Sequence, residues 1–166
     1  MANETETLLS YLNHQRDHVL GILEGLSGED LLKPVLPTGW TCLGLVQHLT
    51  FDIEQFWFRR VVAGESIEPD EMGDDPAAAW KVSASVAPDA VFARYRLEGR
   101  RADAIVAATS PDAEPAAWPE DLFPHWRLPD LRAITLHVIA ETACHAGHLD
   151  AARDLLDGRT WLILTG

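Results

Sequence analysis

LRAITLHVIAETACHAGHLDAARDLLDG, residues 131–158, is the stretch of the chain that decides the fold. Apolar side chains recur in it at the period of an α-helix that turns one face toward a core. That face is formed by Ile134, Val138, Ala152 and Leu156. Asp130 is a residue type that caps the start of helices, and Gly158 is one that commonly ends them. The stretch therefore predicts a long amphipathic helix from Leu131 to Asp157.

Three further segments show the same apolar period: roughly residues 5–26, residues 41–62, and a segment from Pro88 through Val106. Their ends carry the expected signals. Gly28 and Gly64 follow the first two segments as stops, Thr41 can cap the second, and Pro88 suits the first turn of the third. The sequence thus predicts four amphipathic helices.

Two long connections separate the last three of these helices. Residues 65–87 are acidic, interrupted by prolines and without a sustained period. Residues 110–129 hold five prolines together with Trp118, Phe123 and Trp126, more aromatic surface than a solvated linker usually has, so we expect this connection to fold back over the helices. Four helices with two long connections favour an all-α four-helix bundle of non-simple topology, as a single domain over residues 1–166.

The charge balance excludes several classes of partner. Thirteen Lys and Arg stand against 26 Asp and Glu, a net charge of -13, and a field of that sign repels nucleic acid and anionic membranes. The sequence contains neither an apolar run long enough to span a bilayer nor an N-terminal secretory signal. We therefore expect a cytoplasmic protein that acts on a small molecule, with Cys42 and Cys144 as free thiols.

Four ionisable residues fall within the apolar face of the last helix, all within about 60° of Ile134 around its axis. These are His137, Glu141, His145 and His148. Burying such groups costs on the order of several kcal/mol each unless a partner compensates, and a divalent ion would satisfy them together. Glu141 and His145 lie one turn apart, the spacing of two ligands to one ion, and His48 is the candidate third ligand from the helix over residues 41–62. Two His and one carboxylate suit zinc and also non-haem iron.

Other residues are assigned to the site with alternatives left open. His137 and His148 either support a metal ligand by a hydrogen bond, line the mouth of the site where a cofactor would bind, or are ordinary helix-face residues. Arg16 falls on the apolar face of the first helix, so its guanidinium needs an acid; an internal ion pair is favoured over a substrate carboxylate. Asp52 either orients a ligand or belongs to solvated surface.

Three remaining features are expected at the periphery. His14 and His18 are one turn apart at the edge of the first helix and predict exposed surface. Cys144 flanks the apolar face and predicts a buried, inert thiol. The apolar tail at residues 161–164 is expected to pack back on the bundle or to join a homodimer interface.

TGWTCLGLVQHLTFDIEQFWFRR (residues 38–60) and LHVIAETACHAGHLDAARDLLDG (residues 136–158) together resemble the DinB-like metalloprotein superfamily. The similarity is to its mini-circle-protein branch, which is related to mycothiol-dependent maleylpyruvate isomerase. The resemblance implies a bundle in up-down-down-up order with one divalent ion on His48, Glu141 and His145. Zinc is the first expectation for that ion, with nickel, iron and manganese as alternatives.

The same resemblance implies a metal-dependent enzyme. Known members use a low-molecular-weight thiol, mycothiol or bacillithiol, as co-substrate for S-transfer or isomerisation of a small electrophile. Two alternatives stay open: a hydrolase acting through metal-bound water, and a non-catalytic metal-binding or stress protein. An exchangeable water on the ion distinguishes a catalytic site from a structural one.

Overall fold

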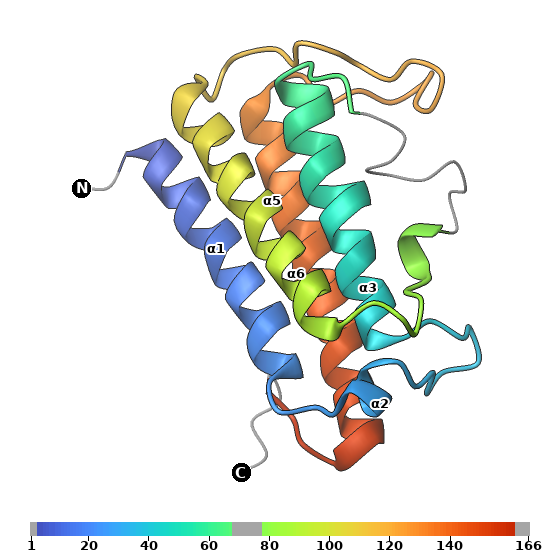
Figure 1. Cartoon of the computed structure of the whole chain (residues 1–166). Coiled ribbons are helices and arrows are strands. Elements are labelled where there is room, and N and C mark those ends of the chain that lie inside the picture. Colours follow the sequence, from blue (N-terminus) through green and yellow to red (C-terminus); the bar gives the residue numbers. More distant parts are fainter. Residues whose placement is uncertain (1–2, 68–77, 162–166) are drawn as a thin grey trace.

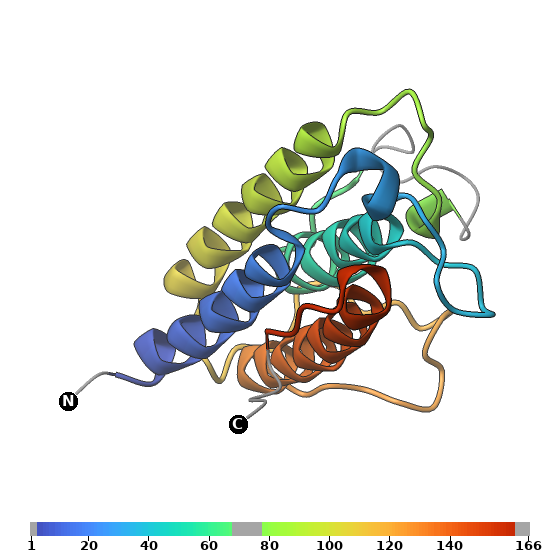
Figure 2. The same ribbon diagram turned by 90° about the horizontal axis from the view of Figure 1, so that it is seen from below.

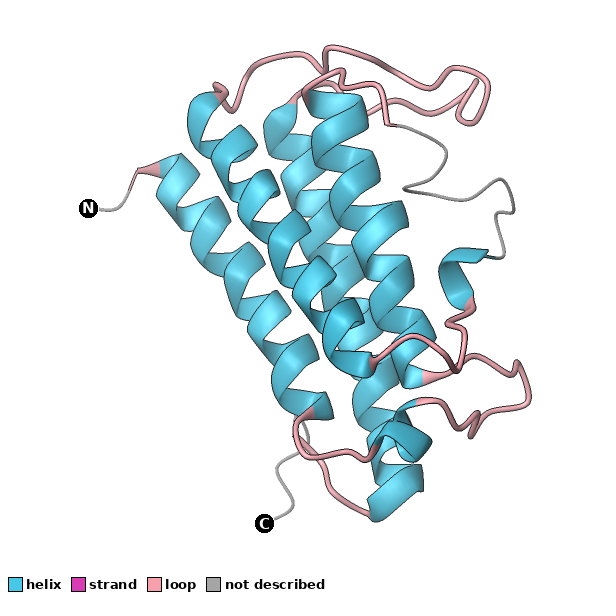
Figure 3. Cartoon of the chain, viewed as in Figure 1, coloured by secondary structure: helices cyan, strands magenta, loops and turns pink. Residues whose placement is uncertain are grey.

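The structure, a computed structural model, describes residues 3–67 and 78–161. Its long helices are α1 (Glu4–Leu23), α3 (Cys42–His48) with its direct continuation η1 (Leu49–Val62), α5 (Pro88–Ala108) and α6 (Leu131–Asp157). Two short helices, α2 (Gly28–Leu31) and η2 (Ala78–Trp80), lie in the connections. Within these described ranges no strand occurs (Figure 3), so the predicted all-α class is confirmed.

The long helices form a bundle in the expected order of directions. In Figure 1, α1 runs downward, α3–η1 and α5 run upward, and α6 runs downward, which is the up-down-down-up topology. Seen from below in Figure 2, α1 lies between α5 and α6. On the other side, η1 packs on both α5 and α6, and α3 also contacts α6. The fold therefore places the end of α3 beside the middle of the chain's last helix.

Most helix ends coincide with the predicted capping residues. The side chain of Asp130 accepts a hydrogen bond from the backbone N–H of Ala133, and Gly158 ends α6 with a φ of 74°. The Thr41 side chain accepts from the Gly44 N–H at 3.0 Å at the start of α3. These bonds satisfy backbone donors that a helix start leaves without a partner, so local chemistry sets the boundaries.

The end of the first helix differs from the prediction. The helix stops at Leu23 rather than near residue 26, and Gly28 begins α2 instead of ending α1. Gly25 makes the turn with a φ of 79°. The buried guanidinium of Arg153 donates to the carbonyls of Ile22 at 2.6 Å and Glu24 at 2.9 Å. The Arg153 side chain of α6 thus caps the end of α1. This is a tertiary interaction, so the local sequence pattern does not predict it.

The second helix changes form along its length. Residues Leu49–Val62 adopt the wider π-helix, whose hydrogen bonds skip one more residue than those of an α-helix. Six consecutive residues of it, 53–58, are buried, because this segment packs against α3, α5 and α6. The apolar period identifies a helix here, but it does not distinguish an α-helix from a π-helix, so the sequence predicted the helix and not its π form.

The proline-rich connection folds back over the bundle as predicted and crosses its upper end in Figure 1. Its backbone is held to the end of η1, because the N–H groups of Ala116 and Ala117 donate to the carbonyls of Val62 and Val61. Trp118 and Phe123 pack against the hydrophobic core from this connection. The loop thereby becomes a wall on one side of the bundle.

Both cysteines are free, as expected. Cys42 is buried, but Cys144 is exposed, so the prediction of a buried thiol at that position is wrong. No helix in the described part of the chain is long and apolar enough to cross a membrane.

Candidate metal centre

The three predicted metal ligands come close together between α3 and α6. His48 is the last residue of α3, while Glu141 and His145 lie one turn apart on α6. The ring centroids of His48 and His145 are 5.0 Å apart in an edge-on arrangement. The Nε2 atom of His145 lies 3.9 Å from Oε2 of Glu141. Two helices far apart in sequence therefore bring two imidazoles and a carboxylate to one place.

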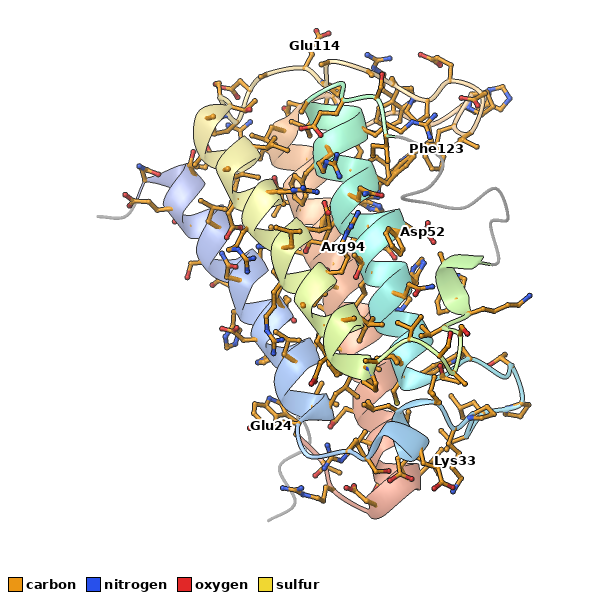
Figure 4. All side chains as sticks on the ribbon, viewed as in Figure 1. Glu24, Lys33, Asp52, Arg94, Glu114 and Phe123 are labelled. Atoms are coloured by element: carbon orange, nitrogen blue, oxygen red, sulfur yellow. The ribbon has the colours of Figure 1, made fainter. Side chains whose placement is uncertain are left out.

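Asp52 contacts one of these imidazoles from η1. Its Oδ2 lies 2.7 Å from Nδ1 of His48, one turn earlier in the chain. An ionised carboxylate can only accept, so Nδ1 carries a hydrogen, and in the neutral form of the ring Nε2 is the nitrogen with the lone pair. Figure 4 shows Asp52 on the same side of the bundle as Phe123 of the proline-rich connection. Of the two sequence alternatives for Asp52, the contact favours orientation of a ligand.

His145 is held in its neutral form. Burial, together with the neighbouring His48 and His148, which disfavour a positive charge beside them, lowers its pKa to about 4. One of its ring nitrogens, Nδ1, lies 3.4 Å from Nδ1 of His148. If His145 donates through that nitrogen, its Nε2 lone pair faces Glu141, the arrangement found in histidines that bind metal.

The side chains of the three candidate ligands are of the chemical types that bind a divalent ion, but their donor atoms do not point to one common position. Among the described residues, no three His, Cys, Asp or Glu side chains are arranged so that they would hold one ion together. The Glu141 side chain is 41% exposed, so it is free to turn toward the imidazoles. Neutral imidazoles with outer partners and one carboxylate are the donor set of open zinc sites, so these residues fit such an ion.

The buried face of α6 is displaced from its predicted centre. Thr135, Thr142 and Arg153 are buried alongside the apolar residues, so the face is centred further round the helix than Ile134. His137 and Glu141 consequently lie at its flank, partly exposed, and His148 is exposed. The prediction that all four ionisable groups lie inside the apolar face is therefore wrong for His137, Glu141 and His148, which border it, whereas the His145 side chain is only 13% exposed.

One end of the site is walled by indoles that the sequence analysis did not single out. The Trp80 ring stacks on His48 with centroids 4.0 Å apart and planes 18° from parallel. Trp40 lies 6.5 Å from His148, also between centroids. No spacing rule links residues 40 and 80 to the helices they contact, so only the folded chain reveals this wall.

The other end is walled by the proline-rich connection. His137 lies edge-on to Trp57 at 4.9 Å and to Trp126 at 5.3 Å. Trp118 and Phe123 complete the aromatic cluster. Burial lowers the pKa of His137, and the charge of Glu141 one turn away opposes that shift. His137 and His148 thus lie at opposite ends of the three candidate ligands.

Arg16 takes part in a different cluster. It is buried, and its guanidinium donates to Glu54 on η1 at 2.6 Å and 2.7 Å and to Asp103 on α5 at 2.6 Å. These acids are the internal partners that the sequence analysis favoured over a substrate carboxylate. Within the described residues, the structure does not bring Arg16 together with His48, Glu141 or His145.

A comparison with protein families adds the class of protein. The chain belongs to the mycothiol-S-transferase family, whose model matches residues 7–158. This is a DinB-like family, so the resemblance noted in the sequence and its link to mycothiol are confirmed. No curated protein and no solved structure matches the chain.

Proposed function

We propose that the protein is a metal-dependent S-transferase that joins a low-molecular-weight thiol of the mycothiol type to a small electrophilic substrate. One observation carries the metal part of this proposal: His48, oriented through Asp52, faces a neutral His145 beside Glu141. Family membership supports the thiol part. The ligands would be His48, Glu141 and His145, with zinc as the ion.

A zinc-like ion bound there would lower the pKa of a thiol and favour its thiolate at neutral pH. The chain's own residues would position the reactants. We assign His148 and the Trp40 wall to the thiol, and His137 and the aromatic cluster around Trp126 to the electrophile. Excluding water between these walls would strengthen every charge interaction in the site.

The transfer balances without an oxidant or reductant. The thiol gives up its proton, its sulfur forms a bond to the electrophilic carbon, and the leaving group departs with the electron pair of the broken bond. The nucleophile would come from outside the protein. Burial raises the pKa of Cys42 to about 11, which keeps that thiol protonated and unreactive.

The test combines metal content with a conjugation assay. The zinc-loaded protein is mixed with mycothiol, bacillithiol or glutathione and a reactive haloaromatic compound. We expect conjugation above the uncatalysed rate with at least one thiol, and loss of both zinc and activity in His145→Ala. His125→Ala, which alters an exposed loop histidine, is the matched control and should behave as wild type.

Other outcomes would support the alternatives. Bound zinc that carries exchangeable water, with no conjugation for any thiol, would favour a hydrolase. Zinc closed off from water would favour a non-catalytic metal-binding protein. No zinc bound by the wild type would overturn the metal part of the proposal.

Location and assembly remain predictions. We propose a cytoplasmic protein whose apolar tail either packs back on the bundle or joins a homodimer interface. Residues 162–166 lie outside the described residues. Trp161 is described: its backbone N–H donates to Oδ1 of Asp150 at 2.6 Å, and its ring lies over Gly21, where an added Cβ would come within 2.6 Å of the ring. Sedimentation of the full chain and of a chain ending at Arg159 would test the dimer.

A further inference from the structure

The contact between Trp80 and His48 joins the connection over residues 65–87 to the candidate metal centre. The two rings are nearly parallel at 4.0 Å, and the Trp80 ring also lies 6.1 Å from His145. Trp80 is only partly buried, and it belongs to a helix of three residues. Something outside η2 must therefore hold it in place.

Gly44 is what allows this placement. A Cβ added at Gly44 would come within 2.3 Å of the backbone oxygen of Trp80, a distance that real Cβ atoms do not show. Gly44 lies one turn before His48 on α3, so the absence of its side chain lets η2 lie directly on that helix. One turn later, the Gln47 side chain donates to the carbonyl of Lys81 at 3.2 Å.

We propose that Gly44 and Trp80 are positioning residues for His48. Asp52 restrains the imidazole of His48 through the hydrogen on Nδ1 of that ring. The stacked indole of Trp80 restrains the plane of the imidazole. Together they would hold the Nε2 lone pair toward α6. The metal-binding consequence rests on the proposed function, but the restraint on the ring does not.

The test uses two glycines of the site. Gly44→Ala forces the Trp80 backbone away, whereas Gly147→Ala lies between His145 and His148 at a position where a Cβ would meet nothing within 4 Å. Zinc titration calorimetry should show affinity weakened about 10- to 100-fold in Gly44→Ala, the range for loss of a ligand's outer support, and unchanged in Gly147→Ala. Trp80→Ala should reproduce the loss, and Trp80→Phe, which keeps a stacking ring, should restore most of it.

A readout without metal separates this inference from the proposed function. In the zinc-free protein, solvent exchange of the His48 Nδ1 proton, followed by NMR, should be at least tenfold faster in Trp80→Ala than in wild type and Trp80→Phe. Equal exchange in all three would overturn the positioning role even if zinc binds. Faster exchange in a protein that binds no zinc would uphold the restraint and reject the metal proposal. If Gly44→Ala fails to fold, the two Trp80 variants decide the question.

A second pair of imidazoles lies on α1, away from the candidate centre. His14 and His18 are one turn apart, with ring centroids 4.2 Å from each other. His14 is exposed, and it borders a surface hollow of about 550 Å³ that is also lined by Tyr11 and Asp17. Helix α1 contributes none of the three candidate ligands, so this pair is a separate feature.

The geometry points to a second, surface site for a divalent transition ion that favours imidazole, such as Ni²⁺ or Cu²⁺. Two histidines one turn apart on an exposed helix can chelate one ion, with water filling the other positions. The carboxylate of Asp17 and the net charge of -13 favour a cation at this surface. No movement of the helix backbone is required.

Stoichiometry tests this site independently. Titration with Ni²⁺ should show one more equivalent bound by wild type than by His14→Ala or His18→Ala, with His125→Ala as control. His145→Ala should keep this equivalent, because it alters only the candidate centre. Equal stoichiometry in wild type, His14→Ala and His18→Ala would refute the surface site and leave the metal centre proposal unaffected.

Discussion

Two clusters of ionisable residues lie between helices of the same bundle. They differ in how far their charges and hydrogen-bonding groups are paired within the protein. In the first, here the Arg16 cluster, the guanidinium bonds Glu54 through Nε and Nη2 and Asp103 through Nη1. In the second, the candidate metal centre of His48, Glu141 and His145, the two imidazole rings lie edge-on with centroids 5.0 Å apart, and Oε2 of Glu141 lies 3.9 Å from Nε2 of His145. One cluster is closed by its own opposite charges, whereas the other gathers imidazoles and a carboxylate, the donor types that bind a divalent ion.

The direction of the pKa shifts makes the same distinction. Burial lowers the pKa of Arg16, but Glu54 and Asp103 outweigh it and raise the value above its usual range. Burial also lowers the pKa of His145, and there His48 and His148 add to the effect. Burial thus acts in the same direction on both groups, but the outcomes are opposite because the neighbours are acids in one cluster and imidazoles in the other. A closed cluster stabilises the fold, whereas an open one is suited to bind a ligand.

The largest expected effect breaks the closed cluster. Glu54→Ala leaves the Arg16 charge buried with its main partner removed, which costs about 3–5 kcal/mol of unfolding free energy. Urea unfolding of the zinc-free protein measures it. Glu114→Ala, at an exposed position in the proline-rich connection, should change stability by less than about 0.5 kcal/mol. A similar small loss in Glu54→Ala would mean that the Arg16 cluster does not stabilise the bundle.

Much of the fold could be predicted because its signals are local. Asp130, Thr41 and Gly158 act within one turn of the helix they begin or end, so their effect can be read from neighbouring residues. The end of α1 could not be predicted in this way. It depends on Arg153, which is about 130 positions away and reaches the α1 carbonyls only after folding.

The candidate site shows the same division. The spacing of Glu141 and His145 identified the pair on one helix, and the fold brings His48 to it. The burial of Thr135 and Thr142 was missed because a hydroxyl counts as polar in a sequence pattern. Each one donates to the carbonyl four residues earlier, at 2.8 Å, and is therefore buried without an unsatisfied group. Pairwise contacts such as Trp80 on His48 leave no periodic trace.

A second prediction uses pH to separate the clusters. The pKa of His145 falls from 6.5 to about 4 on folding, so the unfolded chain binds its proton first as the pH is lowered. Stability of the zinc-free protein should therefore be lost as pH falls from about 6.5 toward 4, by on the order of 3 kcal/mol from this residue. His145→Gln should show a correspondingly flatter dependence in unfolding experiments at pH 7 and pH 4. Parallel curves would show that His145 is not held neutral by the fold.

The third prediction concerns the effect of added zinc on stability. Zinc at one hundred times its Kd should raise the unfolding free energy by about 2.7 kcal/mol through mass action. Measured in a His14→Ala background, so that the surface pair does not contribute, this gain should disappear in Glu141→Ala and His145→Ala. Glu54→Gln, which alters only the closed cluster, should keep it. Thermal unfolding, with elemental analysis of the same samples, would measure the gain in stability and the zinc content of each variant. Full zinc occupancy in Glu141→Ala and His145→Ala would contradict the ligand assignment.

The smallest effect comes from a matched pair of substitutions, one in each cluster. The side chains of Asp52 and Asp103 are similarly exposed, at 36% and 33%, and each contacts a nitrogen of a cluster member. Asp52→Asn weakens the support of a ligand and should reduce zinc affinity about 10- to 100-fold while changing stability little. Asp103→Asn removes a charge that helps to balance Arg16, so it should lower unfolding free energy by about 1 kcal/mol and leave zinc affinity unchanged, since it lies in the other cluster. Calorimetry measures the zinc affinity of both variants, and urea unfolding measures their stability. If both variants lost zinc affinity equally, the two clusters would be coupled through η1, and their separation into a closed and an open centre would be wrong.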